Sequence, residues 1–187
     1  MLQNIGKDIY IKKVDKMKQI FINEDDLREE DLEGTVIRVK AMIINSNKEI
    51  LLAHNNGTYQ FPGGHKEEDE AMDDTLLREV KEETGIDVSL DVGPFMQIVT
   101  YDSNYFGTGR KMCSKIYYYV IHTDEVPNYA ETNYDELECQ TDFNLMYTDV
   151  IGLSSFLDEA VEEGTMDPNI CREMKLVAEE YNRIYNS

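Results

Sequence analysis

The sequence of 187 residues predicts an α+β fold, in which a mixed β-sheet lies between helices as an α/β/α sandwich. Short β-branched and apolar segments separated by turn residues recur between about residues 35 and 150, as is typical of strands. One helical pattern interrupts this run of strands, and two more follow it. Helices in these positions cover both faces of a sheet, which gives three layers.

Length and a hydrophobic content of 41% fit one domain with an additional terminal segment. We expect residues 1–33 to be an N-terminal extension of uncertain structure, and residues 34–187 to be the domain with its C-terminal helices. No apolar run approaches the roughly 20 residues that cross a bilayer, and the N-terminus lacks a signal-peptide core. Three cysteines without CxxC spacing read as reduced thiols. The sequence therefore predicts a cytoplasmic protein without a membrane partner.

The strands are expected in order along the domain. "TVIRVKAMIIN" and "EILLAH" come first, and the pair Asn56-Gly57 then predicts a tight turn into the short extended piece "TYQFPGG". Later candidates are "IDVSL", "PFMQIVTYD", "CSKIYYYVIHT" and "FNLMYTDV". Together they predict a mixed sheet of six or seven strands.

Three helices are expected. The first spans about residues 72–84, where Met72, Leu76 and Val80 form an apolar stripe, and Gly85 supplies a left-handed C-terminal cap. The other two close the chain as "LSSFLDEAVEEG", stopped by Gly164, and "DPNICREMKLVAEEYNRIY". In the last of these, Asp167 is the expected N-cap, and Pro168 follows at the first helical position.

A formal net charge of −20 limits the partners of this protein. Affinity for nucleic acids comes mainly from lysine and arginine, so general nucleic-acid binding is disfavoured. An anionic small-molecule substrate would need help from a metal. For most of the 38 acidic residues, the simpler interpretation is that they keep the protein in solution.

Three glutamates of the first helix stand out from this background. At roughly 100° per residue, Glu79, Glu82 and Glu83 lie within about 100° of one another around the helix axis. Carboxylates placed in this way can converge on Mg²⁺ or Mn²⁺. The alternative is an ordinary solvated helix face. Arg78 can hold Glu79 by a charge-assisted hydrogen bond or form an ion pair with Glu70.

The wider spacing favours the metal site. The segment reads as Gly64, five residues, Glu70, seven residues, Arg78-Glu79-Val80, one residue, Glu82-Glu83, one residue and Gly85-Ile86. This pattern resembles the Nudix box, the signature of the Nudix hydrolases, with every defined position filled. The surrounding order of strands resembles the Nudix domain from about residue 34 to about residue 165. One departure is Ala71, where this family often has a serine or threonine cap.

The resemblance implies hydrolysis of a pyrophosphate bond in a nucleoside diphosphate linked to another group. It implies that metal-bound water is the nucleophile, with Mg²⁺, or alternatively Mn²⁺, held by Glu79, Glu82 and Glu83. Arg78 would then orient Glu79, and Gly64 would shape the loop before the helix. The resemblance leaves the general base open between Glu83 and later glutamates, namely Glu131, Glu136 and Glu138. The competing interpretation is a nucleotide-sensing protein that kept the fold but not turnover.

Substrate contacts are expected in "TYDSNYFGTGRK". Tyr101, Tyr105 or Phe106 can stack on a nucleobase, and Arg110 or Lys111 can meet a phosphate. The alternative is a plain hairpin that turns at residues 107–109. The tyrosine position resembles that of Nudix hydrolases of diadenosine polyphosphates. His65 is of interest because it follows the paired glycines, and the N-terminal segment offers a surface for a homodimer.

Overall fold

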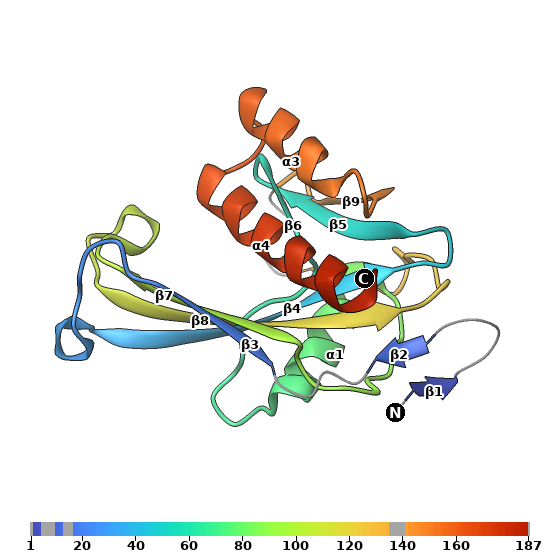
Figure 1. Ribbon diagram of the computed structural model, residues 1–187, viewed down its shortest axis with the longest axis horizontal. Helices are drawn as coiled ribbons and strands as arrows, with labels where there is room; N and C mark the ends of the chain where they lie inside the picture. The colour runs from blue at the N-terminus through green and yellow to red at the C-terminus, as the bar shows by residue number, and fades with distance from the viewer. Residues whose placement is uncertain (1, 5–9, 13–16, 135–140, 187) are drawn as a thin grey trace.

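The computed structural model describes residues 2–4, 10–12, 17–134 and 141–186, and its centre is a mixed seven-stranded sheet (Figure 1). The strand order is β3-β7-β8-β4-β5-β6, and β9 also pairs with β5. Two short strands near the N-terminus, β1 and β2, form a separate antiparallel pair. The strands are β1 (Leu2–Asn4), β2 (Tyr10–Lys12), β3 (Lys18–Ile22), β4 (Gly34–Ile44), β5 (Glu49–Asn55), β6 (Thr58–Gln60), β7 (Met96–Asp102), β8 (Met112–His122) and β9 (Asn144–Asp149).

In the residues that the structure describes, three α-helices cover the sheet, as expected. They are α1 (Met72–Thr84), α3 (Leu153–Glu162) and α4 (Pro168–Tyr185). α3 and α4 lie on one face, where they share a core with side chains such as Met42, Ile44 and Tyr118 (Figure 1). α1 packs on the opposite face, where Leu76 and Val80 contribute to a second core. The predicted order of layers and the α+β class are confirmed.

The predicted turn at Asn56-Gly57 and the predicted N-cap of α4 are both present. β5 and β6 form a hairpin around Asn56 and Gly57, whose φ angles of 49° and 69° suit the reversed turn that matches strand twist. At the start of α4, the carboxylate of Asp167 accepts hydrogen bonds from the backbone N–H groups of Asn169 and Ile170. α1 has no side-chain hydrogen bond at its N-cap, Ala71.

Two parts of the chain differ from the sequence expectation. The segment "IDVSL" forms no strand, because residues 85–90 pair with no other strand and Lys81 instead binds Asp87 beside the end of α1. Conversely, no structure is predicted for residues 1–33, and five of them form β3, which runs parallel to β7 at the edge of the sheet. The acidic segment that follows is a connector with one short 3₁₀ helix, Glu29–Asp31.

β4 pairs with two strands and with the loop that leads into α1. Its whole length pairs in parallel with β8, and its C-terminal end also pairs with β5. Toward its N-terminal end, the loop before α1 takes the place of β5, since Ala41 and Val39 donate backbone hydrogen bonds to the carbonyls of Pro62 and Gly64. In the described part of the chain, no helix is long and apolar enough to span a membrane.

Candidate functional site

α1 presents its acidic residues beside the loop that leads into it. The helix begins and ends at the predicted residues, and Gly85 follows it with φ of 70°, the predicted left-handed cap. Because Leu76 and Val80 are fully buried against the sheet, the orientation of the helix around its axis is fixed. This orientation directs Glu79 and Glu82 toward Arg78 and places Glu83 in the interior, where it is only 4% exposed.

Arg78 is the hub of the cluster. Its Nε and Nη2 donate to the two carboxylate oxygens of Glu70 at 2.9 and 3.0 Å, which is a bidentate pair. Its Nη1 donates at 2.9 Å both to Glu79 and to Glu82. The two roles that the sequence left open for Arg78 are therefore both present. The guanidinium is the main reason that the pKa of Glu70 falls to about 2, and the Glu70 carboxylate in turn raises the pKa of Arg78.

Gly63 and Gly64 bring the loop close to the helix. The Gly63 N–H donates to Glu83 Oε2 at 2.9 Å, so the loop backbone orients this buried carboxylate. A Cβ atom on Gly64 would lie 2.4 Å from the carboxylate of Glu79, and one on Gly63 would lie 2.2 Å from the carbonyl oxygen of Val39. Side chains at either position would push the loop away from the acidic cluster. The physical role of the predicted Gly64 is this close approach.

The cluster has the donor chemistry of a site for a hard divalent cation. Carboxylate oxygens are the ligands that Mg²⁺ and Mn²⁺ prefer. Within the described ranges, however, no group of three or more acidic, histidine or cysteine side chains is already gathered for a metal. Glu79 and Glu82 instead converge on Arg78. A carboxylate offers about four lone-pair sites, so contact with Arg78 is compatible with binding a cation.

A later loop caps the C-terminal end of α1. The N–H groups of Asn128 and Asn133 donate to the helix carbonyls of Thr84 and Glu82. Lys81 binds Glu131, one of the three later glutamates considered as a base. Glu131 is thereby committed to an exposed ion pair. The other two, Glu136 and Glu138, lie outside the described residues.

The predicted substrate residues fall into two groups. Tyr105 and Phe106 stand together at the tip of the β7–β8 hairpin, with ring centroids 4.6 Å apart, and Phe106 is 72% exposed. Tyr101 packs edge-on against Phe21 of β3. Because side chains alternate along a strand, Tyr101 lies on the face of the sheet opposite to that of its neighbours Thr100 and Asp102. Arg110 makes a long contact of 3.4 Å with Glu33. Only the first group approaches the box.

Arg38, a residue that the sequence analysis did not select, links Tyr105 to the loop of the box. Arg38 Nε donates to His65 Nε2 at 3.0 Å, and Arg38 Nη2 donates to the hydroxyl of Tyr105 at 2.7 Å. His65 also accepts a hydrogen bond from Arg78 through its carbonyl oxygen. Burial, and then the charges of Arg38 and Lys40, lower the pKa of His65, so its Nε2 is available as an acceptor.

Lys40 is the second cation on this strand. It is 6% exposed, and its Nζ donates to Gln60 Oε1 at 3.1 Å. Burial lowers its pKa, while the nearby charges of Glu173 and Glu83 act in the opposite direction. Two cations alternate with apolar residues in "TVIRVKAMIIN", and this spacing puts both on one face of the strand. That pattern is the signal by which the sequence could have revealed them.

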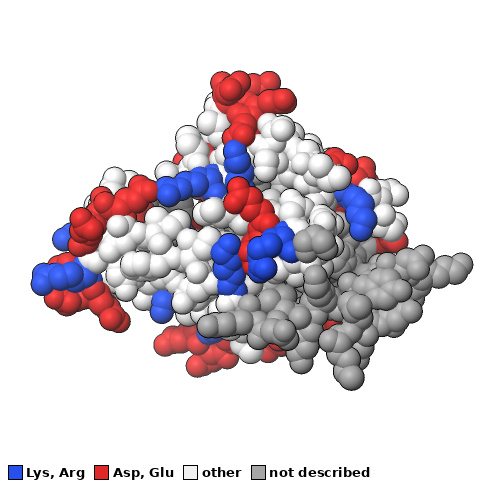
Figure 2. Space-filling model, in the orientation of Figure 1, with Lys and Arg blue, Asp and Glu red and all other residues white. Residues whose placement is uncertain are grey.

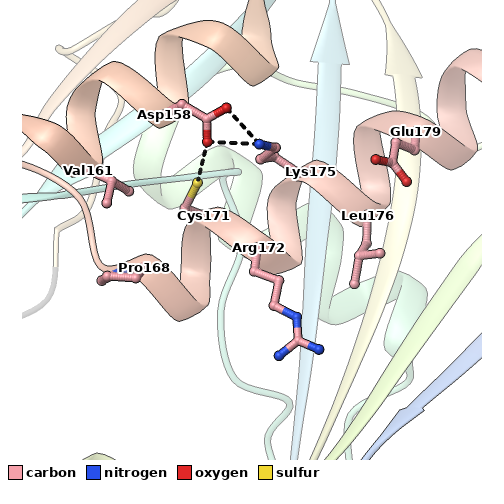
Figure 3. Close-up of a pocket in the computed structure, with 8 residues that line it drawn as sticks. All are labelled: Asp158, Val161, Pro168, Cys171, Arg172, Lys175, Leu176 and Glu179. Carbon is pink, nitrogen blue, oxygen red and sulfur yellow. Dashed lines mark hydrogen bonds and ion pairs between the residues drawn. The ribbon is translucent and has the colours of Figure 1, made fainter.

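A surface pocket of about 380 Å³ lies elsewhere, between α3 and α4 (Figure 3). Asp158 of α3 accepts hydrogen bonds from Lys175 and Cys171 of α4 across it. No residue of the acidic cluster lines this pocket. It is therefore separate from the candidate site.

Comparison with known proteins decides the family. The family model described as NUDIX domain matches residues 34–143, which is more than half of the chain. The chain belongs to the Nudix family. The resemblance based on residues 64–86 is thus confirmed, and the acidic cluster around Arg78 is the Nudix box of this protein.

Two curated relatives match parts of this Nudix chain. Nudix hydrolase 2 of Arabidopsis thaliana is 39% identical over 62 residues, which are 29% of this chain and 22% of the relative. The 8-oxo-dGTP diphosphatase of Proteus vulgaris is 49% identical over 39 residues, which are 21% of this chain and 35% of the relative. The chain therefore spans about a fifth and about a third of these two proteins.

Solved structures show the same fold. MutT from Methanosarcina mazei Go1 aligns with a TM-score of 0.53 at 20% identity, over 81% of this chain and 99% of its own. A bifunctional NMN adenylyltransferase/ADP ribose pyrophosphatase from Francisella tularensis, solved with AMP and an Mn ion, aligns with a TM-score of 0.51 at 19% identity. That alignment covers 78% of this chain and 42% of the other. Both support a Nudix architecture.

Proposed function

We propose that this Nudix protein hydrolyses a pyrophosphate bond in a nucleoside diphosphate linked to another group. The observation that carries the proposal is the convergence of the box on one place. Arg78 binds Glu70, Glu79 and Glu82, and the loop backbone binds Glu83. Nudix hydrolases generally use divalent metals and act on small nucleotides, and carboxylates held by one arginine and by the neighbouring loop offer the oxygen ligands that such chemistry requires.

Each residue has a definite task in this proposal. Glu79, Glu82 and Glu83 would hold Mg²⁺ or Mn²⁺, and Arg78 positions the first two of them. The chemistry that such a cation would supply is a lower pKa of bound water and neutralisation of phosphate oxygens. We assign Glu83 the role of general base, because its carboxylate is buried and is oriented by the Gly63 N–H. Phe106 and Tyr105 provide ring faces for a nucleobase.

The decisive experiment removes single charges from the box. Glu82→Gln and Glu83→Gln should each lower Mg²⁺-dependent turnover by about 100-fold or more, since loss of even an indirect metal contact costs about 10–100-fold. Loss of substrate and formation of the two phosphorylated products would be measured by anion-exchange chromatography with 8-oxo-dGTP, ADP-ribose, dinucleoside polyphosphates and sugar nucleotides. Glu159→Gln is the matched control, because Glu159 is exposed on α3 and its substitution removes the same charge. Near-normal turnover in both box variants would reject the assignment.

The competing function is a nucleotide sensor without turnover. Such a protein would bind nucleotides in the presence of Mg²⁺ but would cleave no member of this panel. The intact set of box acids favours the enzyme. A cytoplasmic location and a homodimer stay predictions of the sequence.

A further inference from the structure

We propose that Arg38 receives a phosphate group of the nucleotide substrate beside the metal site, and that His65 and Tyr105 hold its guanidinium in place for this purpose. The inference rests on the proposed function and adds a specificity-determining contact to it. It starts from the charge of the molecule, because a protein of net charge −20 repels an anionic substrate. Some cation near the box must offset that repulsion.

Most cations near the box are already committed. Arg78 is paired with Glu70, Glu79 and Glu82. Lys81 binds two carboxylates on the outer side of the helix end. Lys66 donates to backbone carbonyls of its own loop. Arg78 and Lys81 use all their N–H donors and cannot meet a phosphate without giving up a partner, whereas Lys66 keeps one of its three donors.

Arg38 differs from them in its partners. Within the described part of the chain, its guanidinium donates to neutral groups, the His65 ring nitrogen and the Tyr105 hydroxyl, and forms no ion pair with a carboxylate. These two hydrogen bonds use two of the five N–H donors of a guanidinium. The remaining donors suit the fork geometry with which arginine binds phosphate.

The position of Arg38 also fits a substrate contact. His65 directly follows Gly64, which lies against the Glu79 carboxylate, and the His65 carbonyl accepts from Arg78. A phosphate chain that reaches metals on the box therefore has Arg38 as its neighbour on the strand side. Lys40 is next on the same face of β4 and lies near Glu83.

The other side of Arg38 faces aromatic rings. Its guanidinium carbon lies 5.8 Å from the ring centroid of Tyr105 and 5.3 Å from that of Phe106. Phe106 is exposed and has φ of 48°, a left-handed backbone conformation that costs free energy in a residue with a side chain. An anion-binding fork beside an exposed ring matches a nucleotide, in which a phosphate and an aromatic base are joined by one sugar.

Binding of an uncleavable nucleotide tests this assignment independently of turnover. The probe is α,β-methylene-ADP with Mg²⁺, titrated by calorimetry. Arg38→Ala should weaken its binding by about tenfold or more, because charge-assisted hydrogen bonds are among the stronger polar contacts. Arg38→Lys should recover part of the loss. Arg172→Ala is the control, since it removes an exposed arginine of α4 whose partner is Glu24.

A purely structural role for Arg38 gives a different result. If Arg38 only fastens the hairpin to the box, Arg38→Ala lowers Tm but leaves the Kd of the probe equal to that of Arg172→Ala, which would overturn the proposal. Tyr105→Phe tests positioning. It should weaken the probe several-fold in the wild-type background and have no further effect when Arg38 is already alanine.

The outcomes separate this inference from the proposed function. Binding that depends on Arg38 in a protein that cleaves nothing would reject the hydrolase and keep the phosphate contact. Turnover in which Arg38→Ala changes neither KM nor the probe Kd would keep the hydrolase and reject the contact. A wild-type protein that does not bind the probe would count against the contact as well.

Discussion

Gly85 shows how one residue joins α1 to the loop that covers its C-terminal end. It has φ of 70°, and an added Cβ would lie 2.1 Å from the carbonyl oxygen of Asn128. Gly85→Ala therefore meets both a strained backbone and a clash with the loop. Gly164, after α3, is the matched control, because it has φ of 75° and open space around its Cβ position.

The two substitutions should differ in free energy of unfolding, measured with urea. Gly164→Ala should cost about 1–2 kcal/mol for the left-handed conformation alone. Gly85→Ala should cost roughly 1–3 kcal/mol more, which is typical of overpacking. Equal losses would show that the loop at Asn128 moves aside without resistance.

At this scale the sequence identifies the box but not its surroundings. Spacing along one helix is a local property, so the positions of Glu79, Glu82 and Glu83 relative to one another follow from the helical period. The contact of Arg38 with His65 and Tyr105 joins three segments that are distant in the chain. Such a contact depends on strand pairing and hairpin conformation, which no local pattern specifies.

Helix ends carry the clearest prediction at the scale of elements. The N-cap of α1 is Ala71, which makes no side-chain capping bond, whereas the N-cap of α4 is Asp167, which makes two. Ala71→Ser should raise the free energy of unfolding by about 1 kcal/mol, because serine can accept from the N–H groups of the first turn. Asp167→Ala should lower it by about the same amount. Urea titration of both variants would measure these changes, and an Ala71→Ser variant no more stable than the wild type would contradict the argument.

The elements also show why some strands could be predicted and others could not. β4, β5 and β8 are long and rich in apolar residues, and their burial on the sheet agrees with their pattern. "IDVSL" has a similar local pattern, but it pairs with none of the described strands. β3 is a strand that the local pattern does not predict. It forms by parallel pairing with β7, which joins residues 78 positions apart, such as Gln19 and Gln97.

For the whole molecule, the dominant physical fact is its charge. Figure 2 shows acidic side chains over the outer end of α3 and at the free ends of the long strands, and basic side chains between these groups and near the middle of the view. A net charge of −20 opposes the compact state through self-repulsion. Raising KCl from about 0.1 M to about 1 M shortens the Debye length from roughly 10 Å to roughly 3 Å. The repulsion should weaken accordingly.

We therefore expect Tm to rise by about 2–4 °C over this range of KCl, which corresponds to roughly 1 kcal/mol for a chain of this size. Tetramethylammonium chloride should raise Tm by the same amount, since screening depends on ionic strength. It does not depend on whether the cation can bind directly to carboxylate groups. Millimolar Mg²⁺ should add a further rise that the Glu82→Gln and Glu83→Gln variants lose, because only site binding stabilises by mass action. A salt effect restricted to KCl would mean that specific ion binding, and not the overall charge, limits the stability of this protein.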